Sequence, residues 1–213
     1  VEIEFAANLD RGDRLNIFNV LQIRPIAEGA SSINVDWSKV DTSNALIYSE
    51  SALGTGAVND VCEVVYLRQE NFDPASTEKI AEEITLLNNQ MREEGRGYVL
   101  VGFGRWGSSN PWLGVPVKWS DISEAKVIVE CGLENFRIEP SQGTHFFQNV
   151  TSLGVGYLSL NPSRGEGLLD TVQLDTMPAL IDGEYLRCVE FPTPLYIYVD
   201  GQSKKGIVKQ SEE

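Results

Sequence analysis

The sequence contains only one histidine, His145, and only three cysteines. A single imidazole cannot supply the paired ligands of a histidine metal site, and the thiols of Cys62, Cys131 and Cys188 are too widely spaced for a CxxC motif. Serine-hydrolase chemistry is not supported either, because the sequence has no GxSxG motif and no second candidate base. Each cysteine lies in an apolar, strand-like run, so we expect buried free thiols in a reducing compartment.

Long uncharged apolar runs are also missing, and the first twenty residues already carry several charges, so we expect neither a membrane span nor a signal peptide. Basic residues are scarce. The formal net charge is -14, and such a surface repels nucleic acid and acidic lipid. We therefore expect a cytoplasmic protein with no nucleic-acid and no membrane partner. A small anion such as a nucleotide stays compatible, because a few arginines can form a local positive pocket. These features leave the oligomeric state open, with a homo-oligomer as one alternative.

The pattern of apolar residues predicts an α+β fold, mainly antiparallel β with one long helix. The helix is expected to begin at Asp73 and Pro74 and to end at Gly95. A second, short helix is expected near residues 142–150. Strands are expected at residues 45–48, 61–68, 98–103, 113–119, 125–131, 155–160, 185–191 and 195–199.

Two more apolar stretches, residues 1–7 and 15–26, flank a polar connection and predict a hairpin ahead of the main domain. The small and polar residues 27–43 predict a linker. We therefore divide the chain into an N-terminal unit at residues 1–30, a C-terminal α+β domain at residues 45–203 and a polar tail at residues 204–213. Because the first residue already lies in a strand-like stretch, we interpret the chain as a fragment.

The segment from Gly102 to Gly107 reads GFGRWG and matches the dinucleotide-binding pattern. That pattern requires a helix directly after the third glycine, and Pro111 prevents one here, so we reject a Rossmann site. One interpretation is a turn in which Arg105, Gly104 and Gly107 hold a small anion with the help of backbone N–H groups. The alternative is a tight turn in which Arg105 pairs with an acidic side chain and the nearby tryptophans fill the core.

His145 stands in the segment SQGTHFFQN. It is a candidate catalytic residue, either as a phosphoryl acceptor or as an acid–base group, with Thr144 or Gln142 orienting the ring. The alternative, which we favour, is a structural histidine that packs against Phe146 and Phe147.

Glu2 and Glu4 alternate with apolar residues along the first strand, so both belong to one face. If the second strand of the hairpin is the partner, Gln22 and Arg24 share that face. Two carboxylates, an amide and a guanidinium together can hold magnesium and phosphate oxygens. The alternative is an ordinary salt-bridged hairpin.

The same two stretches, VEIEFA and VLQIRPI, resemble the end of the ATP-grasp domain in phosphoenolpyruvate synthase and pyruvate phosphate dikinase. The resemblance implies that residues 1–30 are a two-stranded part of a nucleotide-binding domain. It implies that Glu4 serves the magnesium–ATP site and that Gln22 and Arg24 lie on the phosphate side. Glu2, a weaker magnesium candidate, stands where the family usually has aspartate.

This resemblance implies that the parent protein is a phosphotransferase of the pyruvate, water dikinase type that uses Mg²⁺, ATP and pyruvate. The family's phosphohistidine sequence is not found, since GTHFF around His145 shares only Gly, Thr and His with it, and the chain is too short for the pyruvate-binding barrel. We therefore do not expect the fragment to be active alone. The alternative function is a non-catalytic module for small-anion binding or subunit assembly, attached to an ATP-grasp domain.

Overall fold

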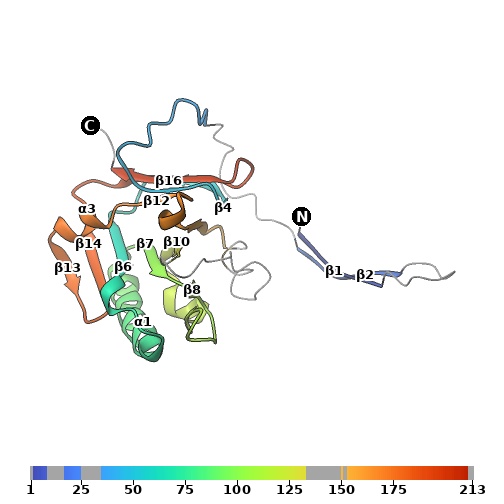
Figure 1. The fold of residues 1–213 in the computed structure, drawn as a ribbon, viewed down its shortest axis with the longest axis horizontal. Coiled ribbons are helices and arrows are strands. Elements are labelled where there is room, and N and C mark those ends of the chain that lie inside the picture. The colour runs from blue at the N-terminus through green and yellow to red at the C-terminus, as the bar shows by residue number, and fades with distance from the viewer. Residues whose placement is uncertain (1, 9–16, 25–34, 133–149, 151–152, 211–213) are drawn as a thin grey trace.

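The main body of the molecule, built from residues 35–132 and 153–210, has three layers (Figure 1). The computed structural model describes residues 2–8, 17–24, 35–132, 150 and 153–210. In Figure 1 the long helix α1 (Thr77–Glu94) forms the lowest layer, a seven-stranded sheet forms the middle layer, and a five-stranded sheet forms the top. The expected α+β class with one long helix is thus confirmed.

Helix α1 forms where its sequence signals place it. The Asp73 side chain accepts a hydrogen bond from Ala75 N, and a short 3-10 turn, η2 (Pro74–Ser76), leads into the helix. One face of α1 is buried through residues at helical spacing, and Gly95 ends the helix with a left-handed φ of 67°. The buried residues of this face are Thr77, Ile80, Ile84, Leu87, Asn88 and Met91.

The seven-stranded sheet has the order β13-β14-β6-β7-β10-β11-β4. Its four central strands, β6, β7, β10 and β11, are parallel to one another, whereas β14, β13 and β4 are antiparallel to their neighbours. The strands are β4 (Ala52–Leu53), β6 (Glu63–Leu67), β7 (Tyr98–Phe103), β10 (Ala125–Cys131), β11 (Gly156–Leu160), β13 (Ala179–Asp182) and β14 (Leu186–Glu190).

The parallel centre was not expected from the sequence, which favoured mainly antiparallel strands. Its physical basis is burial on both faces: α1 covers one face of the sheet and the second sheet covers the other. Every residue of β6, β7 and β11 is buried. Such continuous apolar runs are typical of parallel strands with both faces covered, and α1 supplies the crossover from β6 to β7.

The five-stranded sheet is antiparallel, in the order β12-β3-β16-β15-β5. Residues 205–210, which we expected in a polar tail, form its central strand β16, so that prediction was wrong. Ile207 and Val208 are buried between Lys205 and Lys209, and the strand is paired on both sides, with β15 and with β3. The strands are β3 (Ala45–Ser49), β5 (Thr55–Val58), β12 (Leu168–Leu169), β15 (Leu195–Asp200) and β16 (Lys205–Gln210).

One apolar cluster joins the two sheets and α1. Close approach between the sheets depends on glycines: a Cβ on Gly206 would lie 2.2 Å from a methyl of Leu158, and one on Gly156 would lie 2.9 Å from a methyl of Val199. The sheets therefore pack as a sandwich whose inner face is closed to larger side chains at these points.

Shorter elements complete the body. The expected strand at residues 113–119 is only partly formed: a two-residue strand β9 (Gly114–Val115) pairs in parallel with β8 (Arg105–Trp106), and Trp119 already begins a 3-10 turn. The expected short helix near residues 142–150 lies almost wholly outside the described residues. The remaining elements are η1 (Gln69–Asn71), η3 (Trp119–Ile122), η4 (Pro162–Arg164) and α3 (Thr171–Thr176).

Candidate functional site

The N-terminal hairpin brings the residues proposed for nucleotide binding onto one face. Strands β1 (Glu2–Asn8) and β2 (Ile17–Arg24) pair antiparallel, with Glu2 opposite Arg24 and Glu4 opposite Gln22. Directly opposite residues of an antiparallel pair share a face, and so do residues two apart in one strand. The register thus places all four residues on the same face of the hairpin.

The other face of the hairpin is apolar. Phe5 and Phe18 stack there with ring centroids 4.5 Å apart, and Ile3 and Ile23 are register partners. These side chains are more than half exposed, with Phe18 at 59% and Ile23 at 62%. A two-stranded ribbon with an open apolar face is marginally stable by itself, so this face calls for a covering layer.

The glycine-rich turn at the end of β7 is shaped by close backbone contacts. Gly104 has a φ of 90°, and a Cβ there would lie 3.0 Å from the backbone of Leu113. A Cβ on Gly102 would lie 2.4 Å from the ring of Trp106, which is buried over it. Both glycines are therefore required by local geometry.

The backbone N–H groups of this turn are committed within the fold. Gly104 N donates to Cys131 O at 3.1 Å, Arg105 N to Leu113 O at 2.7 Å, and Gly107 N to Val115 O at 2.8 Å. We had expected these backbone N–H groups to help hold a small anion. Because they already donate within the fold, they form no anion nest, and an anion bound here would be held by the Arg105 side chain instead. Trp106 fills the core as the structural interpretation predicted, whereas Trp112 is 73% exposed.

A buried carboxylate, which the sequence analysis missed, fixes this turn to the sheet. Glu130, near the end of β10, is fully buried, and its carboxylate accepts hydrogen bonds from Trp106 N at 3.0 Å and from the Tyr157 hydroxyl at 2.5 Å. A polar group at such a site is stable only when it is hydrogen-bonded. The available signal was one glutamate inside the apolar run VIVECGL.

A second buried carboxylate lies at the opposite end of the parallel strands. Glu63, at the start of β6, is nearly buried and pairs with Arg96, whose guanidinium also contacts Glu94 and Glu190. Burial by itself lowers the pKa of Arg96, but hydrogen bonding and attraction from Glu63, together with Glu94 and Glu190, raise it overall. This cluster joins β6, β14 and the end of α1, so its arrangement serves the fold.

Four sequence expectations remain to be placed. His145 lies outside the described residues. Among the residues that are described, no three His, Cys, Asp or Glu side chains come together as a metal site. Cys131 and Cys188 are buried and Cys62 is partly buried, and all three are free thiols as expected. Over the described ranges, no helix combines the length and the apolar character that a membrane crossing requires.

Comparison with known proteins gives no relative. The chain matches no protein-family model, no curated protein and no solved structure.

Proposed function

We propose that this chain is the C-terminal part of a phosphoenolpyruvate synthase-like phosphotransferase that uses Mg-ATP, and that it contributes the β1–β2 hairpin to the nucleotide site. The observation that carries the proposal is the backbone register, which pairs Glu2 with Arg24 and Glu4 with Gln22. This arrangement is what the resemblance to the ATP-grasp domain requires, and it follows from hydrogen-bond pairing independently of the motif.

The residue types on this face suit magnesium and phosphate. Carboxylate oxygens of Glu4 and Glu2 are the hard ligands that Mg²⁺ prefers, and the ion would neutralise phosphate charge. The guanidinium of Arg24 can hold a phosphate with two parallel hydrogen bonds, and the amide of Gln22 can orient one. Positioning and charge neutralisation are the main needs of phosphoryl transfer. In this proposal pyruvate is the acceptor in the cytoplasmic parent protein.

The apolar face of the hairpin supports the same proposal. A nucleotide site needs a rigid support, and Phe5, Phe18 and Ile23 offer a surface on which the rest of a nucleotide-binding domain can pack. With one polar and one apolar face, the hairpin has the pattern of a sheet edge that borders a ligand on one side and a core on the other.

The test uses the longer protein that contains this chain and its preceding residues, mixed with magnesium, ATP and pyruvate. We expect AMP, phosphate and phosphoenolpyruvate as products. Glu4→Gln and Arg24→Met are expected to lower turnover by about a hundredfold or more, because they remove charge stabilisation of the transferred group. The matched controls Glu93→Gln and Arg164→Met change exposed residues of the body and are expected to keep full turnover. Normal turnover in the hairpin variants would refute the proposal.

A second candidate is a non-catalytic assembly module. The exposed ring of Trp112 favours it, because large exposed aromatic side chains often anchor protein interfaces. In this case the body would contact another copy of the chain, and the hairpin variants would leave association unchanged. Sedimentation of the wild type and of Trp112→Ala distinguishes the two: loss of a dimer in the variant supports assembly, and a monomer in both removes this candidate.

A further inference from the structure

Residues 35–43, which we call the strap, lie across the outer face of the five-stranded sheet. The indole N–H of Trp37 donates to the Asp200 carboxylate at 3.1 Å, and its ring lies 5.7 Å from the ring of Tyr198. The ammonium of Lys205 lies 5.9 Å from the centre of the Trp37 ring. One tryptophan thus contacts β15 and β16 at the same time.

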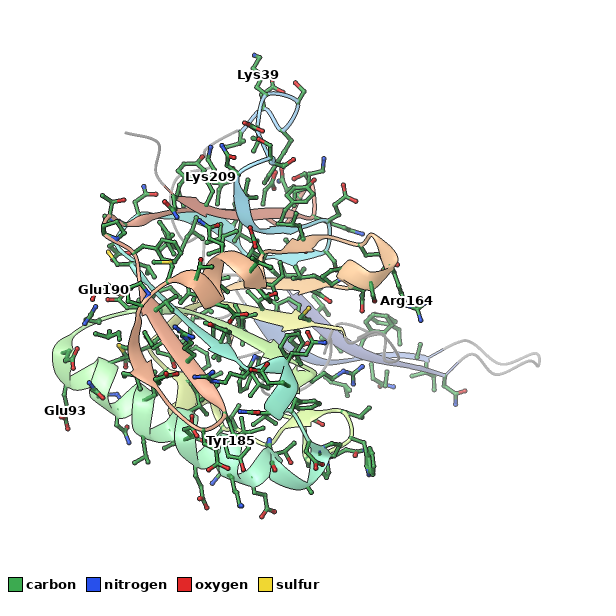
Figure 2. The ribbon with its side chains drawn as sticks, turned by 60° about the vertical axis from the view of Figure 1, so that its left-hand side comes forward. Lys39, Glu93, Arg164, Tyr185, Glu190 and Lys209 are labelled. Carbon is green, nitrogen blue, oxygen red and sulfur yellow. The ribbon has the colours of Figure 1, made fainter. Side chains whose placement is uncertain are left out.

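Hydrogen bonds also fix the end of the strap where it enters the sheet. Asp41 accepts a hydrogen bond from Ser43 N at 2.9 Å, and Ala45 N, at the start of β3, donates to Thr42 O at 3.2 Å. The backbone hydrogen bond from Ser43 is the main reason that the pKa of Asp41 is lowered. Figure 2 shows Lys39 and Lys209 on the side of the body opposite Glu93 of α1.

The strap packs on a small apolar cluster of its own. Val35, Trp37 and Val40 cover Ala45, Tyr198 and Ile207, and this cluster is separate from the main core between the sheets and α1. The strap can therefore detach by local opening, without exposing the main core.

We propose that the strap is a releasable anchor that limits how far the hairpin can move from the body. Eleven peptide steps separate Arg24 from Val35, and twenty-one separate it from Ala45. At about 3.5 Å per step, an attached strap allows a reach of about 40 Å and a released strap about 75 Å. Trp37 is then a positioning residue, because its contacts with β15 and β16 set how far the hairpin can move from the body.

The anchor itself is tested by limited trypsin cleavage of the 213-residue chain. Lys39 lies in the strap with its side chain 81% exposed, and cleavage after it requires local opening, whereas cleavage after Lys205 requires opening of β16. Trp37→Ala is expected to speed cleavage at Lys39 by about tenfold or more, because it removes a charge-assisted hydrogen bond and the apolar contacts. Cleavage at Lys205 should not change, and Trp37→Phe should give a smaller increase.

Two results would overturn the anchor: an unchanged rate at Lys39 in Trp37→Ala, or an equal increase at Lys39 and Lys205, which would make Trp37 part of the global fold. Leu86→Ala, which changes an exposed large apolar residue of α1, is the control and should leave both rates unchanged.

The effect on the hairpin rests on the proposed function and is tested in the longer protein. Trp37→Ala is expected to lower kcat several-fold while the Kd for Mg-ATP stays unchanged, since the strap does not belong to the nucleotide face. A changed Kd with normal kcat would contradict this role. If the protein binds no Mg-ATP at all, the proposed function fails, and the trypsin experiment still decides whether the strap is a releasable anchor.

Discussion

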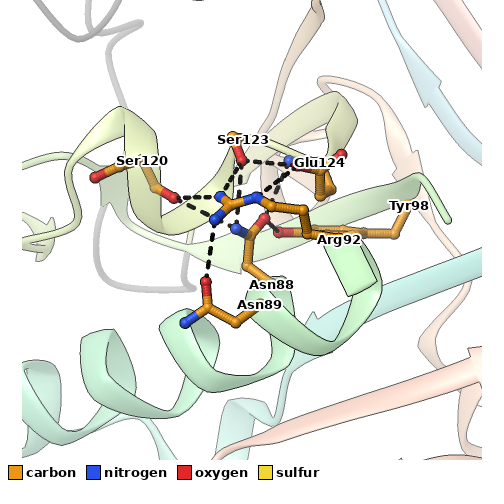
Figure 3. A network of polar contacts seen from close by, with 7 residues as sticks. All are labelled: Asn88, Asn89, Arg92, Tyr98, Ser120, Ser123 and Glu124. Carbon is orange, nitrogen blue, oxygen red and sulfur yellow. Dashed lines mark hydrogen bonds and ion pairs between the residues drawn. The ribbon is translucent and has the colours of Figure 1, made fainter. Parts of the chain in front are cut away.

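Replacing Asn88 by alanine is expected to destabilise the body by about 3–4 kcal/mol. Asn88 is fully buried in α1, and its side-chain oxygen accepts hydrogen bonds from the Tyr98 hydroxyl at 2.9 Å and from Glu124 N at 3.0 Å (Figure 3). Alanine leaves both donors without this acceptor, and each buried donor without a partner costs about 1–3 kcal/mol. The better helix propensity of alanine returns about 0.5 kcal/mol.

Loss of the Asn88 side-chain nitrogen adds no comparable cost to the free energy of unfolding. Its nitrogen contacts Ser120 O at 3.3 Å and the Ser123 hydroxyl at 3.4 Å, and both oxygens also receive a hydrogen bond from Arg92. They keep that donor in the variant. The free-energy change therefore comes mainly from the Tyr98 hydroxyl and Glu124 N, which lose the Asn88 oxygen as their acceptor.

The assay is urea unfolding of the wild type and the variant, followed by circular dichroism. A loss of this size corresponds to a fall in Tm of about 10 °C for a chain of this length. Asn89→Ala is the matched control, because Asn89 is exposed on the same helix and undergoes the same change of side chain. Its stability should stay within about 0.5 kcal/mol of the wild type.

A double-mutant cycle separates the hydrogen-bond explanation from a packing defect. Tyr98→Phe alone should cost about 1 kcal/mol, because it removes one partner of Asn88. In the Asn88→Ala background the same change should be neutral or stabilising, since it removes a hydroxyl that already lacks its partner. An equal cost in both backgrounds, or a loss below about 1 kcal/mol for Asn88→Ala, would refute the reasoning.

Two further predictions concern the core. Gly102→Ala places a methyl against the ring of Trp106 and should cost about 1–3 kcal/mol, measured by the same unfolding assay. Burial raises the pKa of the Cys131 and Cys188 thiols to about 12, so a thiol reagent should label only Cys62 in the native protein and all three in urea. Because the unfolded thiols ionise near pH 9 and the folded ones do not, this contribution to stability is fully present below pH 9 and decreases as the pH rises toward 12. Labelling of Cys131 at the rate of Cys62, or a flat stability between pH 8 and pH 10, would contradict it.

The hairpin and α1 were predictable because their information is local. Alternation along residues 1–7 and 15–26 sets the two strands of the hairpin, and the Asp73–Pro74 start with the Gly95 stop sets the helix. The direction of β6, β7 and β10 was not predictable in this way. A buried apolar run reads the same in a parallel and in an antiparallel sheet, and the choice depends on where α1 returns the chain.

Strand β16 and Glu130 show a second limit. Residues 205–210 read as polar because their lysines point away from the core, and only the partners β3 and β15 make them a strand. The carboxylate of Glu130 accepts hydrogen bonds from Trp106 N, 24 residues earlier in the chain, and from the Tyr157 hydroxyl, 27 residues later. Such contacts cannot be predicted from the spacing of residues in the sequence, because they exist only after the sheet has formed.

The polar groups of the body and of the hairpin differ in what they bond to. In the body, Asn88, Glu130 and Asp200 each bond to backbone or side chains of another segment, and the turn at Gly104 donates its N–H groups within the fold. Polar groups that are hydrogen-bonded in this way hold segments of the body together, and breaking these hydrogen bonds to bind a ligand would lower the stability of the fold. The polar residues of β1–β2 are instead placed opposite one another by the backbone register, Glu2 with Arg24 and Glu4 with Gln22. Under the proposed function, the body anchors the hairpin by its strap and the hairpin carries the chemistry, a division of roles that is compatible with this distribution.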